Sequence, residues 1–217
     1  MGTFTAQSIL DKAALVLYDT GNTRWSAAEL LGWLNDGQRE IVALRPDTYP
    51  QTAVVQLAVG TKQSLPADGY TLLTVVRNMG TNGTTVGAAI REVQRKQLDA
   101  DSPGWHAENG YNTTDHFIFD PRTPKTFYVY PPSLGANYVE LVYASVPADI
   151  TDVDEITLDD VYANPLLDYV LYRAYSRDFE QTGAGARAMA HRQAFENSLG
   201  LKAQADAATT TNLAAKG

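Results

Sequence analysis

The spacing of apolar residues changes twice along this chain, and that change limits its fold more than any single motif does. Both ends carry apolar residues three and four positions apart, which is the period of an amphipathic helix. Residues from about 51 to 147 instead form short runs rich in Val, Thr, Tyr and Phe, separated by Gly, Pro and Asn. The sequence therefore predicts an α+β fold, a helical bundle made from N- and C-terminal helices with a mostly antiparallel β insertion.

We expect this pattern to divide the chain into four parts. Residues 1–50 hold the N-terminal helices of a helical body, residues 51–150 the β insertion, residues 151–201 the C-terminal helices of the same body, and residues 202–217 a flexible tail. With 217 residues, of which 44% are hydrophobic, the chain can bury a sizeable core. The helical body is expected to draw on both ends of the chain.

The first fifty residues predict two helices. The first runs from about Thr5 to Asp19, and its apolar face consists of Ile9, Leu10, Ala13, Val16 and Leu17. The second begins after Ser26, which makes a capping box with Glu29, and ends before Pro46. Its apolar face consists of Leu30, Trp33, Leu34, Gly37, Ile41 and Leu44. Gly37 costs about 1 kcal/mol relative to Ala inside a helix, so its place on this face suggests that another backbone approaches closely.

Helical spacing returns after the acidic linker DITDVDEITLDD, residues 149–160. The linker lacks the turn glycine of a calcium-binding EF-hand loop, and Ile156 and Leu158 alternate as in a buried strand, so we expect Asp159 or Asp160 to cap the next helix. Pro165 kinks that helix or marks its first turn. A last helix is expected from about Ala184 to Leu199, ended by Gly200, followed by a tail with too little apolar mass to be ordered alone.

The composition excludes several classes of function. The chain has 17 Lys and Arg against 25 Asp and Glu, so it lacks the excess positive charge that attracts a phosphate backbone, and stable nucleic-acid binding is disfavoured. The absence of Cys excludes disulfides, thiolate zinc sites and cysteine nucleophiles, and it is compatible with synthesis in the cytoplasm. No leader segment and no run of about 20 apolar residues is present, so we expect no membrane partner.

Motifs that could carry chemistry have more ordinary interpretations. GAGARA, residues 183–188, matches a dinucleotide fingerprint, but a predicted helix precedes it where the fingerprint needs a strand. His106, His116 and His191 are scattered and lack metal-ligand spacing. The carboxylates in the loop-rich part of the β insertion do not by their spacing define an acid–base pair; they are Asp99, Asp101, Asp115 and Asp120. The sequence therefore predicts no catalytic, cofactor-binding or metal site.

Tyrosine is the remaining anomaly, with 12 in the chain. Tyr128, Tyr130, Tyr138 and Tyr143 lie on strands predicted to be adjacent, where their rings suit a core, a sugar platform or a protein interface equally well. A surface- or carbohydrate-binding module, or a small hydrolase, built on this Tyr-rich region is therefore an alternative function.

Taken in order, these elements resemble the phage adaptor proteins of the head-to-tail connector and, more loosely, the tail tubular protein A class of short-tailed phages. The resemblance covers most of the chain and is carried by four blocks: TRWSAAELLGWLNDGQREIVALRPD (23–47), KTFYVYPP (125–132), DDVYANPLLDYVLYRAYSRD (159–178) and AHRQAFENSLGLK (190–202). Each block alone is only a well-formed helix or an aromatic strand, whereas the set is fairly specific.

The resemblance implies a structural protein of the virion, assembled in the cytoplasm of the bacterial host. It implies a homo-oligomeric ring, typically of twelve copies, that binds the portal protein and a tail or nozzle protein and lets DNA pass through its lumen without binding it. Trp33 and Gly37 would then serve either the subunit core or the contact between subunits. Leu201 and Leu213, in the tail, are candidates for contact with the portal.

Overall fold

The computed structural model describes residues 3–178 and 181–214, with the backbone alone from residue 201 onward. The chain divides into two compact units, which we call the helical unit (1–45 and 147–217) and the β unit (46–146). The helical unit contains helices and the β unit two sheets with a short helix, so the predicted α+β class with a mostly antiparallel β insertion is confirmed.

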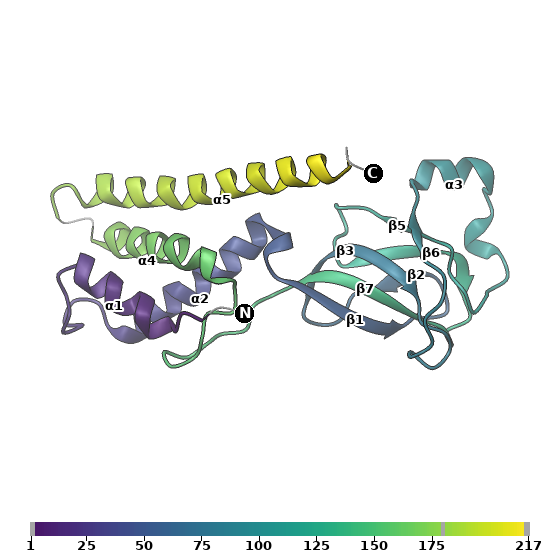
Figure 1. Cartoon of the computed structure of the whole chain (residues 1–217), viewed down its shortest axis with the longest axis horizontal. Coiled ribbons are helices and arrows are strands. Elements are labelled where there is room, and N and C mark those ends of the chain that lie inside the picture. The colour runs from purple at the N-terminus through teal and green to yellow at the C-terminus, as the bar shows by residue number, and fades with distance from the viewer. Residues whose placement is uncertain (1–2, 179–180, 215–217) are drawn as a thin grey trace. The chain divides into compact units, whose positions relative to one another are not determined.

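The helical unit is built around helix α4 (Figure 1). Helices α1 (Ala6–Val16), α2 (Ala27–Leu44) and α5 (Ala184–Ala214) all pack against α4 (Ala163–Arg177), which follows the short 3₁₀ turn η3 (Asp160–Tyr162). Side chains from all four helices are fully buried in this core, among them Ile9, Leu30, Leu34, Ile41, Leu166, Leu171 and Phe195.

The predicted helix starts are confirmed. Thr5 caps α1 by accepting from the amide of Ser8, and Ser26 Oγ lies 3.3 Å from both the amide nitrogen and the carboxylate of Glu29 at the start of α2. Pro165 lies in the first turn of α4, where its missing N–H group leaves no helical hydrogen bond unmade.

Three residues are exposed although helical spacing predicts them on apolar core faces, Val16 and Leu44 in the first two helices and Val161 in the helix that follows the acidic linker. Val16 is 42% exposed, Leu44 51% and Val161 55%. Val16 and Leu44 are the last residues of α1 and α2, and Val161 lies in η3 before α4 begins. The periodic pattern was right for the middle of each helix and wrong at its end, where the neighbouring helix no longer covers the face.

The predicted end of the last helix at Leu199 is also wrong, because α5 continues to Ala214. Gly200 does not adopt the left-handed conformation that commonly ends a helix. A glycine with helical dihedral angles costs only about 1 kcal/mol, and the residues after it are rich in Ala and contain no Pro. The flexibility expected for residues 202–217 stays a prediction.

The β unit contains two sheets. Strands β1 (Pro50–Gln56), β7 (Tyr138–Ser145) and β3 (Gly69–Asn78) form one, and β2 (Gly60–Ser64), β6 (Thr126–Ser133), β5 (His116–Phe119) and β4 (Arg91–Glu92) form the other. Every pairing is antiparallel except β4 with β5. The unit also holds the short helix α3 (Arg95–Asp101) and the 3₁₀ turns η1 (Pro46–Thr48) and η2 (Trp105–Ala107).

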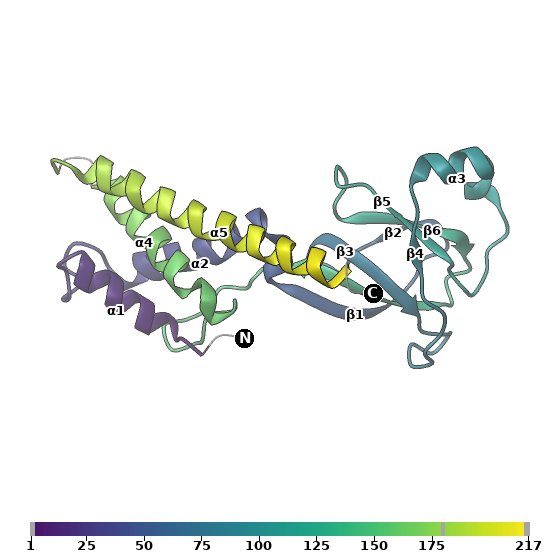
Figure 2. The same ribbon diagram turned by 45° about the horizontal axis from the view of Figure 1, so that its top comes forward.

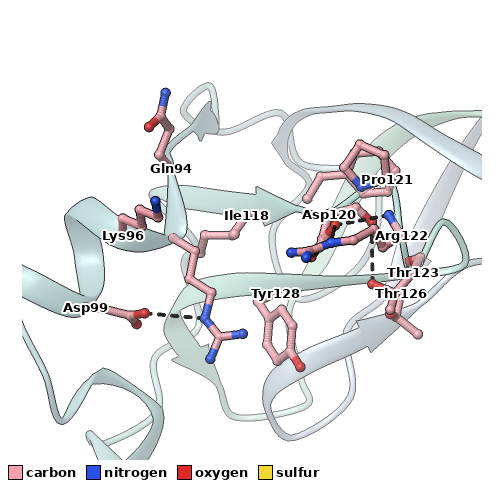
Figure 3. Close-up of a pocket in the computed structure, with 12 residues that line it drawn as sticks. Gln94, Lys96, Asp99, Ile118, Asp120, Pro121, Arg122, Thr123, Thr126 and Tyr128 are labelled. Atoms are coloured by element: carbon pink, nitrogen blue, oxygen red, sulfur yellow. Dashed lines mark hydrogen bonds and ion pairs between the residues drawn. The ribbon is translucent and has the colours of Figure 1, made fainter.

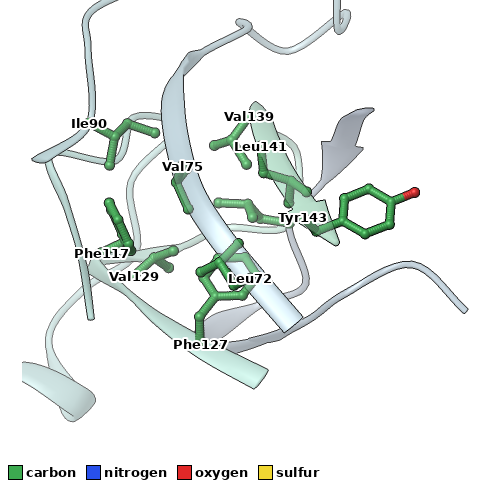
Figure 4. Close-up of a cluster of buried hydrophobic side chains, with 10 residues drawn as sticks. Leu72, Val75, Ile90, Phe117, Phe127, Val129, Val139, Leu141 and Tyr143 are labelled. Carbon is green, nitrogen blue, oxygen red and sulfur yellow. The ribbon is translucent and has the colours of Figure 1, made fainter. Parts of the chain in front are cut away.

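The core of the β unit lies between the two sheets (Figure 4). Leu72, Val75, Val139 and Leu141 come from the three-stranded sheet, and Phe117, Phe127 and Val129 from the four-stranded one. Consecutive strands β6 and β7 therefore face each other across the core and are not hydrogen-bonded neighbours. The expectation that the four tyrosines lie on adjacent strands is wrong: Tyr128 and Tyr130 belong to one sheet, Tyr138 and Tyr143 to the other.

Candidate interaction surfaces

Gly37 lies in the packing between α2 and α4. A Cβ atom at this position would lie 3.0 Å from Cδ1 of Tyr169 and 3.1 Å from Cδ2 of Leu166. The group that approaches the glycine therefore consists of side chains of the same chain, and the expectation that a backbone approaches it is corrected. Gly37 is needed where it is because α4 places two large side chains over it.

Trp33 lies one turn earlier on α2 and is only half-buried. Its ring makes an edge contact with the buried ring of Trp25, with centroids 5.8 Å apart. Arg24 and Arg177 lie over Trp25, 5.5 Å and 5.9 Å from its centroid. The side of Trp33 that this cluster leaves uncovered is available to another molecule, so its role in a subunit contact stays a prediction.

Leu201 and Leu213 lie on the backbone of α5, but their side chains are outside the described residues. The expected contact of these two leucines with a portal stays a prediction.

The acidic linker is tied to the helical unit by buried amides and by the N-terminus. Asn35 exchanges two hydrogen bonds of 3.1 Å with the backbone of Ile150, and Gln38 Oε1 accepts from the amide of Thr157 at 2.7 Å. Ile156 and Leu158 are fully buried, and Asp159 caps η3 by accepting from the amide of Val161, as predicted.

Asp160, the other capping candidate in this linker, has a different partner. It accepts from the amides of Thr3 and Phe4 and so joins the N-terminus to the start of η3. Asp159 and Asp160 thus act as a cap and a tie, as the interpretation of the segment as a structural linker requires.

The histidines remain separated in the structure. His106 Nδ1 lies 2.8 Å from the hydroxyl of Thr61, and His191 Nδ1 lies 2.8 Å from Asp168 and stacks on Tyr175. His116 has a buried Nδ1 without a partner. Within residues 3–178 and 181–214, no three His, Asp or Glu side chains are grouped so that they could hold a metal ion.

The β unit has a hollow of about 520 Å³ beside α3 and the β5–β6 turn (Figure 3). Two of the four carboxylates weighed for acid–base chemistry, Asp99 and Asp120, line it. Asp99 accepts from the indole of Trp105 at 2.9 Å and lies 3.4 Å from Arg95, while Asp120 pairs with Arg122 at 2.8 Å. Hydrogen bonds from the Arg122 side chain lower the pKa of Asp120 to about 2, which suits an ion pair and opposes the raised pKa of a general acid.

The motif GAGARA lies at the start of α5, with Gly183 in the turn that follows α4, so a helix and not a strand precedes it, as predicted. No helix in the described part of the chain combines the length and apolar character that a membrane span requires.

Sequence reasoning missed the loop between α1 and α2. Asp19 is 8% exposed and accepts from the amides of Thr23, Arg24 and Trp25 and from the Thr23 hydroxyl, at 2.8 to 2.9 Å. These bonds, led by the one from Trp25, lower the pKa of its carboxyl to about 2. An aspartate directly before Thr, Gly and Asn could have indicated such a loop, because its carboxylate can accept from amides that follow it. The Asp19 carboxylate thus holds the loop by four hydrogen bonds.

Among the described residues, the groups weighed for chemistry mostly have structural partners, and the features left over are exposed helix faces and loops. Such an arrangement is typical of a protein that acts through its surfaces.

A family model described as SU10 adaptor protein matches residues 4–215, and the chain belongs to that family of phage adaptor proteins. The match spans both units and makes the protein a virion component. None of the curated proteins compared with the chain matches it.

Proposed function

We propose that the protein is one subunit of a closed ring of twelve copies that joins the portal to the tail, or to a nozzle protein, and leaves a channel for DNA. The observation that carries this proposal is the match to an adaptor family over residues 4–215. The ring assembles on the portal in the cytoplasm of the bacterial host. Its role is structural, and it needs no cofactor, metal or catalytic residue.

The distribution of charge supports passage of DNA without binding. The helical unit holds 16 Asp and Glu against 10 Lys and Arg, whereas the β unit holds 9 against 7. The linker from residue 147 to 160 alone holds six acidic residues and no basic one. A lumen lined by such carboxylates repels the phosphate backbone, so DNA slides past it.

The Tyr-rich alternative has less support. Tyr128 and Tyr130 lie around Trp105, with ring centroids 6.1 and 6.4 Å from it, and Tyr143 is buried. Rings divided between two sheets do not make one platform for a sugar, so no second function is proposed.

Assembly in the presence of the portal tests the proposal. An acidic subunit repels its own copies, so the isolated protein should be monomeric or form small oligomers at low concentration, and should form rings when purified portal of the same phage is added. Light scattering and electron microscopy of the protein with and without portal measure this. A portal that recruits no adaptor would contradict the proposal.

The C-terminal segment supplies a second test. We propose that the end of α5 attaches the ring to the portal, with Leu201 and Leu213 in a groove of the partner or with added backbone hydrogen bonds. Deletion of residues 204–217 should then leave the melting temperature of the isolated protein nearly unchanged and weaken its binding to portal. Early unfolding of the truncated protein, or undiminished binding, would contradict this attachment.

A further inference from the structure

The C-terminal end of α1 holds a tyrosine in a conformation that usually belongs to glycine. The amide of Tyr18 donates to the carbonyl of Leu15 at 3.2 Å, and the amide of Asp19 donates to that of Ala14 at 2.9 Å. This pair of bonds is the Schellman motif, in which the residue at the position of Tyr18 is left-handed and most often Gly. Tyr18 has φ 56°, so a residue with a Cβ occupies the strained position.

The Tyr18 side chain is not buried, so burial of the ring does not offset this strain. The Tyr18 side chain is 97% exposed, and it stands beside Leu15, 64% exposed, and Val16, 42% exposed. The loop that follows is fixed by the hydrogen bonds to Asp19, so the ring projects from a rigid support. An exposed aromatic side chain that is held in place at a cost to the stability of the fold is typical of a residue that serves binding and not stability.

Helix α5, which lies on the other side of α4 from α1, offers a surface that can receive such a residue. Helix α4 lies between α1 and α5 in both views, and it packs against both (Figures 1 and 2). The outer surface of α5 has a shallow hollow of about 640 Å³, in which Met189 is 70% exposed. Its lining residues are Ala186, Met189, Ala190, Arg192, Gln193 and Glu196, so small side chains leave room between longer polar ones.

We propose that Leu15, Val16 and Tyr18 of one copy dock into the α5 hollow of the neighbouring copy. The two surfaces differ, since one lies at the end of α1 and the other on α5, so each copy can contact two neighbours by the same interface, which is the heterologous contact that closes a ring. The aromatic side chain of Tyr18 packs on Ala186, Met189 and Ala190 of the neighbouring copy. Gln193 at the rim donates to the phenol oxygen. This inference rests on the proposed ring.

Opposite effects on folding and assembly test the role of Tyr18. Tyr18→Gly relieves the strain, so the melting temperature of the isolated protein should rise by about 2 to 4 °C. The same substitution should raise the concentration needed for half-maximal assembly on portal about tenfold or more, because the aromatic side chain that anchors one copy to the next is lost. Asn22→Gly is the matched control, since Asn22 lies in the same loop with φ 49° and should leave assembly unchanged.

Substitution of the hollow gives the reciprocal test. Met189→Arg should impair assembly about as much as Tyr18→Gly does. Val153→Arg adds the same charge at a residue that is 77% exposed in the acidic linker, and it should assemble as the wild type does.

Cross-linking identifies the neighbour directly, because the chain contains no cysteine. The double variant Leu15→Cys with Ala190→Cys, assembled on portal and treated with a short bis-maleimide, should give a ladder of covalent multimers of the adaptor. Each single variant should give none beyond a dimer.

The outcomes separate the two proposals. Wild-type protein that forms no ring on portal overturns the proposed function, and this interface with it. Rings that form equally well with Tyr18→Gly and Met189→Arg, or that yield no ladder, overturn the interface and leave the ring intact. A lower melting temperature for Tyr18→Gly would show that Tyr18 serves folding, which also overturns the inference.

Discussion

The helical unit and the β unit differ in how many segments of the chain form them. The β unit is one continuous segment, residues 46–146, with a core between two sheets that all its long strands share. The helical unit combines residues 1–45 with residues 147–217, and α4 from the second segment fills the space between helices of the first. We therefore expect the β unit to hold all it needs to fold, and the helical unit to form only when the two ends of the chain meet.

Separating the segments should give the largest effect. A fragment of residues 46–146 is expected to unfold in a single cooperative transition, because its core is complete. A fragment of residues 1–45 should stay largely unfolded, because its apolar faces lack α4. Circular dichroism with thermal melting measures both. A β fragment without a melting transition would contradict the expectation that the β unit folds without the helical unit.

Truncation of one core residue in each unit tests whether the two units unfold separately. Leu34 and Leu141 are both fully buried, one in each unit, so Leu34→Ala and Leu141→Ala should each cost about 2 to 5 kcal/mol. Each change should lower the melting transition of its own unit more than that of the other, as followed by calorimetry. An equal shift of a single transition by both variants would show that the units unfold together.

Buried amides should give the next largest effect. Gln38 is fully buried and accepts from the Thr157 amide, while Asn78, 5% exposed in the β unit, accepts from the Thr114 amide at 2.9 Å. Gln38→Ala and Asn78→Ala each leave such an amide unpaired, which costs about 1 to 3 kcal/mol. Denaturant titration measures the loss. The exposed amides Gln193 and Asn109 changed to Ala are the controls and should cause little change in isolated protein.

The smallest effect should appear at low pH. Asp19 and Asp120, one in each unit, both have a carboxyl pKa of about 2, below the ordinary value. A lowered pKa stabilises the folded state above the unfolded-state pKa of about 3.9, and this contribution is lost as pH falls from about 4 to 2. Melting temperatures across this range should therefore fall less steeply in Asp19→Asn than in the wild type.

Asp120→Asn is the comparison variant for this titration. The partner of Asp120 is an exposed arginine on the same turn, and surface ion pairs contribute little to stability. We expect the pH dependence of Asp120→Asn to resemble that of the wild type. A larger change in the pH dependence of the melting temperature for Asp120→Asn than for Asp19→Asn would contradict this expectation.

Local signals predicted the elements well. Ser26 with Glu29, Pro165 in the first turn of its helix, and the alternation of Ile156 and Leu158 act over a few residues, and each appears in the structure as the sequence indicates. The start and type of an element depend on neighbours in the chain, which a sequence shows directly.

Properties that depend on distant residues could not be predicted. The division of the tyrosines between two sheets is decided by which strands pair, and Gly37 is covered by side chains 129 and 132 residues further along the chain. Tyr18 could not be recognised because no glycine or proline marks the end of α1, so neither its left-handed backbone nor its exposure is visible in the pattern. Its hypothetical partner surface on α5 lies still further away.

The pairing of β1 with β7 has a consequence for how such a protein can diversify. Pro50 pairs with Ala144, and the amide of Ser145 donates to the carbonyl of Tyr49, so the β unit begins and ends at neighbouring points. A gene segment that encodes it can be exchanged by recombination between related phages with only two junctions to preserve. Such an exchange would leave the sequence of the helical unit unchanged.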